Sequence, residues 1–342
     1  MPSAPQPHPL SRRGLLARAA AVGAVGLGPA GAGLTSAIAA APPPAPASPQ
    51  PVEASAEYRA HARNIRQSVA HWCFNLNEKT RANPKHGPMS VAELIVHAKR
   101  MGLSSVELLG PEHFKALKDA GLVCAMASSG TRGGFVRGLN NPAHHEHIVQ
   151  RTTAAIDACA EHGFPSVIAF NGFKYRNPDD PASGEIPRDE GAAQCVEGLK
   201  KLAGHAEKRK VTVCLEMLNS RDGSHPMKGH PGYQGDDLDY CADIVRKVGS
   251  PYVKLLFDVY HVQIMNGDVI RRIRQHHELI GHYHTAGNPG RHELDDRNEI
   301  NYPAVMKAIA ETNYQGHVGQ EFIPTWDDKI ASLAHAVKIC DV

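Results

Sequence analysis

Four polar side chains each end a short apolar run in the second half of this chain, and together they could bind a metal ion. The runs are VTVCLE, KLLFD, IGHYH and GHVGQE, and they end in Glu216, Asp258, His284 and Glu321. Successive members are separated by about one strand–helix unit, so in a parallel barrel all four would lie at the rim formed by the carboxyl ends of the strands. One acidic strand end would be unremarkable, whereas four polar ends in succession indicate a shared site.

Three carboxylates that face one cavity repel each other unless one of them holds a proton or a divalent cation lies among them. We therefore predict that Glu216, Asp258, His284 and Glu321 hold one divalent metal ion. Oxygen ligands combined with one imidazole favour Mn²⁺ or Mg²⁺, with Co²⁺ or Zn²⁺ as alternatives. The competing interpretation is that the four residues are unrelated rim residues.

Apolar segments alternate with helical patterns from residue 57 to the end of the chain. We expect strands at residues 68–75, 104–110, 122–130, 165–172, 211–219, 253–261, 281–288 and 316–324. Helical patterns follow these segments at residues 91–102, 111–121, 141–163, 189–210, 236–249, 268–281, 302–313 and 326–340. Such alternation predicts a parallel sheet, and apolar residues at both parities indicate strands that are covered on both faces.

The order of these elements favours a closed barrel over an open doubly wound sheet. No expected strand is followed by GxGxxG, and the chain has no GxxxxGK[ST] motif, so nucleotide-binding folds lose support. We predict a single (β/α)8 TIM barrel catalytic domain of class α/β over residues 57–342.

The first 56 residues have a different composition. Ser11, Arg12 and Arg13 precede an Ala/Gly/Leu run that ends in an Ala-x-Ala pattern, which is typical of a twin-arginine-type signal peptide over residues 1–41. The run is too rich in small residues to predict a permanent membrane span. Residues 42–56 form a Pro/Ala-rich linker. We therefore expect the protein to be exported to the periplasm or the extracellular space.

Composition excludes several classes of partner and site. The net charge is +2, so no nucleic-acid or membrane-surface partner is indicated. The seven cysteines form no CxxC pair, which argues against a zinc ribbon, and most lie in apolar runs typical of buried thiols. Formation of a homo-oligomer stays open.

The segments LEMLN, FDVYHVQIMNGD, GNPGRHELDDRNEINY and GQEF resemble hydroxypyruvate isomerase-like proteins of the xylose-isomerase-like TIM barrel superfamily. The resemblance covers roughly residues 68–335 and is strongest after residue 210. It is most specific in the combination of Pro-Gly-Arg-His-Glu with Glu-Ile-Asn-Tyr.

This resemblance implies particular roles for five residues. Glu216 and Glu321 would be metal-bound catalytic carboxylates, and Asp258 would be a metal ligand. His261 would contact a substrate oxygen, and Arg291 would lie beside the substrate. A guanidinium group also suits the binding of a substrate carboxylate or hydroxyl groups.

The implied activity is isomerisation of a small hydroxy-oxo acid or ketose, with proton transfer through a metal-bound enediolate. Glu216 and Glu321 lie on different strands, so one can remove a proton and the other can return it. The narrower isomerase group usually has Gln where this chain has His284, and related ketose 3-epimerases have His. A sugar 3-epimerase is therefore the alternative. A metal-dependent phosphodiesterase or endonuclease and a non-catalytic exported sugar-binding protein have less support.

Three further residues lie close to the expected strand ends or the first expected strand, and only their position indicates a role. We expect His282 to face the helix layer. Glu107 ends the second expected strand, but the pattern leaves the direction of its side chain undetermined. Trp72 either forms an apolar wall over a small ligand or fills the core.

Overall fold

The computed structural model of the protein describes residues 58–62, 64–131 and 133–342. The signal peptide and the linker that we predict at residues 1–41 and 42–56 lie outside the described residues. Among the residues that are described, no helix has the length and the apolar character needed to cross a bilayer.

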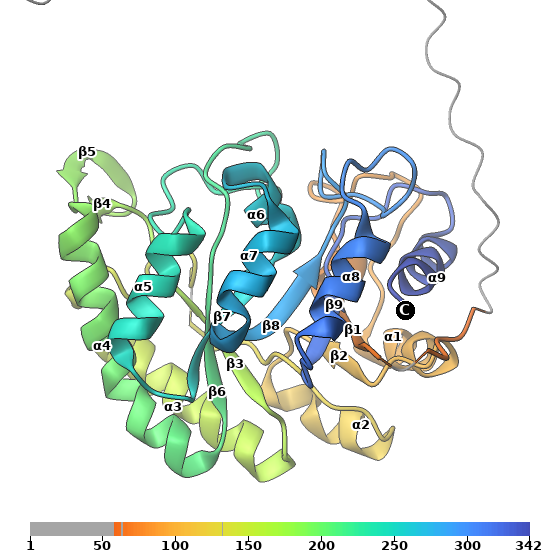
Figure 1. Cartoon of the computed structure of the whole chain (residues 1–342), viewed down its shortest axis with the longest axis horizontal. Coiled ribbons are helices and arrows are strands. Elements are labelled where there is room, and N and C mark those ends of the chain that lie inside the picture. The colour runs from red at the N-terminus through yellow and green to blue at the C-terminus, as the bar shows by residue number, and fades with distance from the viewer. Residues whose placement is uncertain (1–57, 63, 132) are drawn as a thin grey trace, which may run out of the picture. The chain divides into compact units, whose positions relative to one another are not determined.

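Seven parallel strands form a curved sheet in the order β2-β1-β9-β8-β7-β6-β3 (Figure 1). Their bounds are β1 Arg66–Ala70, β2 Ser105–Glu107, β3 Ser166–Phe170, β6 Thr212–Glu216, β7 Val253–Asp258, β8 Ile280–Thr285 and β9 His317–Gln320. Each pair of neighbours runs parallel. The predicted TIM barrel architecture is confirmed.

The segment that we expected as a strand at residues 122–130 pairs only through isolated bridges. Val123 bridges to Ser105, and Ala127 bridges to both Leu109 and Val167, so the segment connects β2 to β3 and completes the ring. Its regularity is lost because the amide of Ala125 donates to the side-chain oxygen of Ser105 at 2.9 Å instead of to a strand carbonyl. The element exists where it was predicted, but it is not a continuous strand.

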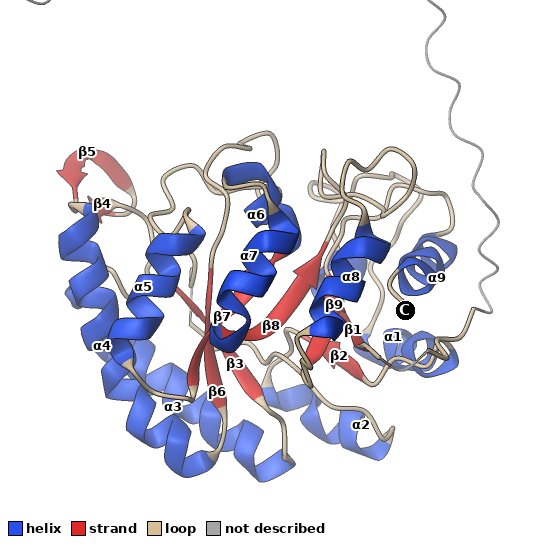
Figure 2. Cartoon of the chain, viewed as in Figure 1, coloured by secondary structure: helices blue, strands red, loops and turns tan. Residues whose placement is uncertain are grey.

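Helices follow the strands and cover the outside of the sheet (Figure 2). The main ones are α1 Val91–Arg100, α2 Phe114–Asp119, α3 His145–His162, α4 Arg188–Arg209, α5 Leu238–Val248, α7 Val269–His276, α8 Tyr302–Glu311 and α9 Lys329–Ile339. Short 3₁₀ turns lie at η1 His71–Phe74, η2 Pro111–His113, η3 Pro142–His144 and η4 His277–Leu279. Ser90 and Glu93 form a reciprocal capping box at the start of α1.

Two local elements differ from the sequence prediction. The strand expected at 253–261 stops at Asp258, because the side chain of Asp258 caps a new helix, α6 Val259–Met265. An antiparallel hairpin, β4 Tyr175–Asn177 and β5 Asp180–Glu185, was not predicted. Its residues are mostly exposed and polar, so they lack the hydrophobic alternation by which a strand is recognised.

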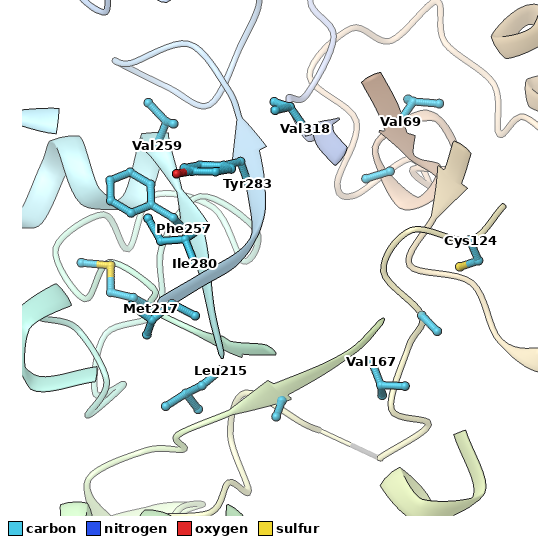
Figure 3. Close-up of a cluster of buried hydrophobic side chains, with 14 of the residues drawn as sticks. Val69, Cys124, Val167, Leu215, Met217, Phe257, Val259, Ile280, Tyr283 and Val318 are labelled. Carbon is cyan, nitrogen blue, oxygen red and sulfur yellow. The ribbon is translucent and has the colours of Figure 1, made fainter. Parts of the chain in front are cut away.

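Strand periodicity separates two buried layers. Leu215, Phe257 and Tyr283 belong to the large cluster between the sheet and the helices, where the rings of Phe257 and Tyr283 lie 5.6 Å apart (Figure 3). Cys214 and Leu256, on the alternate parity, join a separate small cluster inside the barrel. All seven cysteines are buried and free, whereas the sequence predicted burial for most of them.

Asp237 is the N-cap residue of α5, and substitution tests how much it contributes to stability. Asp237 accepts from the amide of Tyr240 at 2.8 Å and from the side chain of Asn266 at 2.9 Å. We expect Asp237→Ala to lower the free energy of unfolding by about 1 kcal/mol, the usual effect of removing an N-cap. Urea denaturation measures this, and Asp237→Ser, which keeps a capping oxygen, should lose less. Equal losses in the two variants would contradict the capping role.

Candidate metal centre

The four strand-end residues predicted from the sequence come together inside the barrel mouth. Glu216, Asp258, His284 and Glu321 each offer a ligand atom, and these atoms all lie within 4.8 Å of one another. Glu216 and Asp258 end β6 and β7, His284 lies on β8, and Glu321 directly follows β9. Asp258 and His284 are fully buried, and the two glutamates are 4% exposed. The arrangement has the size of one coordination shell.

The two ring nitrogens of His284 have different surroundings. Nε2 lies 2.7 Å from Oε1 of Glu107, a carboxylate that can only accept, so Nε2 carries a hydrogen. Nδ1 is buried without a hydrogen-bond partner, 3.0 Å from Oε2 of Glu321 and 3.6 Å from Oε1 of Glu216. Oε1 of Glu216 is likewise buried without a partner. Unpartnered ligand atoms that converge from different strands fit a divalent cation.

Arg291 supplies positive charge to the same group of carboxylates. Its Nη2 donates to Asp258 at 3.1 Å and also to Glu321, and its Nη1 donates to the carbonyl of Met227 at 2.6 Å. The guanidinium lies 5.1 Å from the centre of the Trp72 ring. Trp72 in turn donates to Oε1 of Glu321 at 2.8 Å. The structure therefore places Arg291 and Trp72 at the site, beside the predicted ligands.

His261 reaches the site from the first turn of α6. Its Nδ1 accepts from the backbone amide of Asn219 at 3.1 Å and lies 2.7 Å from the Asn219 side-chain amide. Two donors on Nδ1 leave the hydrogen on Nε2. That Nε2 is buried without a hydrogen-bond partner, 3.5 Å from Oδ2 of Asp258. His261 thus presents a free N–H donor to the site.

The three carboxylates have different pKa values, because burial and neighbouring charges act on each of them differently. Burial, with repulsion from Glu321, raises the pKa of Glu216 to about 7. Burial also raises the pKa of Asp258 to about 6, although Arg291 opposes the shift. Burial alone would raise the pKa of Glu321, but the charges of Arg291 and His284 outweigh it and hold that pKa well below its usual range.

The imidazole of His284 responds to the same charges. Burial alone would lower its pKa, but the Glu321 carboxylate and the bond to Glu107 raise it well above the ordinary value. The charged form of His284 is therefore favoured beside these carboxylates. A divalent cation would balance their negative charge in its place, and its binding would release protons from the ligands.

A cavity of about 160 Å³ adjoins these residues. Glu216, Glu321 and Arg291 line it, and most of its remaining lining is apolar, including Phe135, Phe170, Leu108, Ile168, Leu218 and Met227. His230 lines the same cavity with its ring centre 4.3 Å from that of Phe135. Burial lowers the pKa of His230 to about 4, so the ring is neutral. The cavity has room for a small molecule only.

Sequence reasoning missed His230, left the direction of Glu107 undetermined and gave His282 the wrong direction. The expectation that His282 faces the helix layer is wrong, because residues two apart on a strand share one face and His284 points inward. His282 is buried, and its Nε2 lies 3.0 Å from Oε1 of Glu107. The period-two rule would have found this pair. His230 comes from a long irregular loop, for which no sequence pattern gives a direction.

Comparison with known proteins gives a family match over most of the chain. The family described as "Xylose isomerase-like TIM barrel" matches residues 93–338. The chain is 36% identical over 146 residues to the 2-oxo-tetronate isomerase of Cupriavidus necator, covering 42% of this chain and 53% of that protein. It is 31% identical over 132 residues to the hydroxypyruvate isomerase of Escherichia coli, covering 39% and 48% respectively. The chain thus spans about half the length of these curated relatives.

Among solved structures, the fold is similar to a crystal structure described as an AP endonuclease, family 2, from Brucella melitensis. The TM-score is 0.64 at 23% sequence identity, and the match covers 79% of this chain and 97% of that chain. At this identity the likeness concerns the fold alone.

The pKa values of the cluster predict how metal affinity depends on pH. Glu216 and Asp258, with pKa values of about 7 and 6, hold protons at low pH that compete with a cation. We expect the affinity for Mn²⁺ to rise between pH 5.5 and pH 7.5, measured by calorimetry at the two pH values. Asp258→Asn should weaken binding at both, whereas the same change at the partly exposed Asp222 should not. Affinity that is independent of pH would contradict the assignment of these ligands.

Proposed function

We propose that this chain, which belongs to the xylose isomerase-like TIM barrel family, is a divalent-metal-dependent isomerase of a small hydroxy-oxo acid or ketose. The observation that carries the proposal is the convergence of Glu216, Asp258, His284 and Glu321 on one buried point beside a small cavity. The isomerase names of the curated relatives support the reaction class.

The four residues suit Mn²⁺ or Mg²⁺, with Co²⁺ or Zn²⁺ as alternatives. When bound, such an ion supplies Lewis-acid chemistry, which polarises a carbonyl and stabilises negative charge on oxygen. The site residues provide the rest of the reaction. His261 would donate its free N–H to a substrate oxygen, and Arg291 would help to hold a carboxylate or hydroxyl group next to the reacting carbons.

Two glutamates would move the proton. Glu216 lies at the end of β6 and Glu321 beyond β9, with β7 and β8 between them in the sheet, so their carboxylates approach the site from different sides. One removes the proton next to the substrate carbonyl, and the other returns a proton to the planar enediolate. Return to the neighbouring carbon isomerises the substrate, whereas return to the opposite face of the same carbon inverts it.

The second outcome keeps a sugar 3-epimerase as the alternative activity on the same site. A phosphodiesterase or endonuclease has less support, because the cavity of about 160 Å³ is small and the net charge of the chain is only +2. A non-catalytic sugar-binding protein would have no need of a buried carboxylate on each side of the ligand. The partner is therefore a small-molecule substrate.

We also propose that the protein works outside the cytoplasm. The support is the pattern of Arg12 and Arg13 before a run of small and apolar residues. A substrate of this enzyme would then be met in the periplasm or the extracellular space. Fractionation of cells that produce the full chain tests this, and replacement of both arginines by lysine should retain the protein in the cytoplasm.

The two-base scheme predicts the behaviour of conservative variants. Glu216→Gln and Glu321→Gln each remove one proton acceptor while keeping size and burial, so each should lower kcat by at least about 100-fold. Turnover is measured on hydroxypyruvate and on a panel of ketoses in the presence of Mn²⁺. The exposed Glu112 gives a matched Glu→Gln control that should retain full activity.

Metal content of both variants is measured alongside turnover, since each glutamate is also a proposed ligand. Wild-type activity in either variant would eliminate the two-base scheme. Reaction in deuterium oxide then separates the two activities. Isomerisation places deuterium on the carbon that was the carbonyl carbon, and epimerisation places it on the inverted centre.

A further inference from the structure

A buried carboxylate and a second histidine lie on the far side of His284 from the proposed ligands. Glu107 ends β2 and is fully buried, and His282 precedes His284 by two residues on β8. Oε1 of Glu107 lies 2.7 Å from Nε2 of His284 and 3.0 Å from Nε2 of His282. The two imidazole rings stand at 90° to each other with their centres 5.0 Å apart. Oε1 of Glu107 thus contacts both imidazole rings of β8 from the end of β2.

We propose that Glu107 is a positioning residue, which fixes the hydrogen of His284 on Nε2 and directs Nδ1 to the metal centre, with His282 as the second donor that stabilises its buried charge. The inference rests on the metal centre proposed above. A carboxylate is an acceptor only, so the contact determines which nitrogen of His284 is available to an ion. Such outer partners orient a histidine ligand and increase its basicity.

The neighbouring strand leaves room for this contact. Gly319 of β9 is paired with His284 in the sheet. A Cβ atom at Gly319 would lie 2.2 Å from Oε1 of Glu107 and 2.9 Å from Cδ2 of His284. Both distances are too short for any side chain. The glycine is therefore required by the space that the Glu107 carboxylate and the His284 ring occupy.

The geometry favours hydrogen bonds over a second metal ion in this trio. Ligand atoms bound to one tetrahedral ion at about 2.0–2.2 Å lie more than about 3 Å from one another. Oε1 of Glu107 is 2.7 Å from the nitrogen of His284, which is a normal distance for a charge-assisted hydrogen bond. His282 completes the pair of donors, because a lone buried carboxylate would be costly.

The test compares metal binding by the wild-type protein and by Glu107→Gln. We expect the variant to bind Mn²⁺ about 10- to 100-fold more weakly, the range for loss of an outer partner of a metal ligand. We also expect a changed visible spectrum when Co²⁺ is bound, since the ring of His284 is no longer fixed. Circular dichroism and urea denaturation establish that the variant is folded. The exposed Glu112→Gln variant is the matched control and should bind Mn²⁺ as the wild type does.

A second substitution displaces Glu107 without removing it, which keeps the inference testable if Glu107→Gln does not fold. Gly319→Ala should weaken Mn²⁺ binding in the same direction, because its methyl group competes with the carboxylate for space. The matched control is Gly204→Ala on α4, where an added Cβ meets nothing within 4 Å. It should leave the affinity unchanged.

Three results would overturn the inference, and they are distinguishable. If the wild type binds Mn²⁺ and the folded Glu107→Gln variant binds it equally tightly with an unaltered Co²⁺ spectrum, the positioning role is wrong but the metal centre stands. If the wild type binds two ions per chain and Glu107→Gln binds one, the trio is itself a metal site. If the wild type binds no divalent ion, the metal centre and the positioning role both fail.

Discussion

The structure depends on the balance of charge at the mouth of the barrel. Glu216, Asp258 and Glu321 are all buried with ligand atoms within 4.8 Å of one another, and each uncompensated buried charge would cost several kcal/mol. Arg291 donates to two of the carboxylates, and Nδ1 of His284 lies 3.0 Å from Oε2 of Glu321. These contacts hold the proposed ligand atoms close together, so little further ordering would be needed for an ion to bind.

Three of the four proposed ligands use one atom to contact the scaffold and leave another atom facing the site. Oδ1 of Asp258 caps α6 through the amides of Tyr260 and His261, while Oδ2 faces Arg291. Oε1 of Glu321 accepts from Trp72, and its Oε2 faces His284 and Arg291. His284 binds Glu107 with one nitrogen and turns the other inward. The atom that holds each side chain thus determines which atom is offered to a cation.

The convergence of the four proposed ligands was predictable, because parallel strands bring their carboxyl ends to one rim irrespective of the loops between them. The regular elements were predictable from apolar periodicity. In the segment at 122–130, however, a side-chain hydrogen bond replaces one of the backbone hydrogen bonds of a strand. Asp258 caps a helix where the sequence predicted that the strand continues. The sequence placed Glu107 at a strand end but did not determine the direction of its side chain. The predicted direction of the His282 side chain was wrong, although the two-residue period of a strand would have given the correct one. His230 and the exposed β4–β5 hairpin carry no periodic signal, so only the three-dimensional structure reveals where they lie.

Glu216 differs from the other three proposed ligands in how its side chain is held. Its Oε1 is buried without a hydrogen-bond partner, 3.6 Å from Nδ1 of His284, whereas Glu321 is fixed by Trp72 and Arg291. Both carboxylates line the same small cavity, so both can reach a substrate there. A restrained carboxylate keeps one geometry toward an ion, while an unrestrained one can turn between the ion and a carbon-bound proton. The two glutamates are therefore held differently, and under the proposed two-base scheme Glu216 would be the one that turns more readily toward a carbon-bound proton.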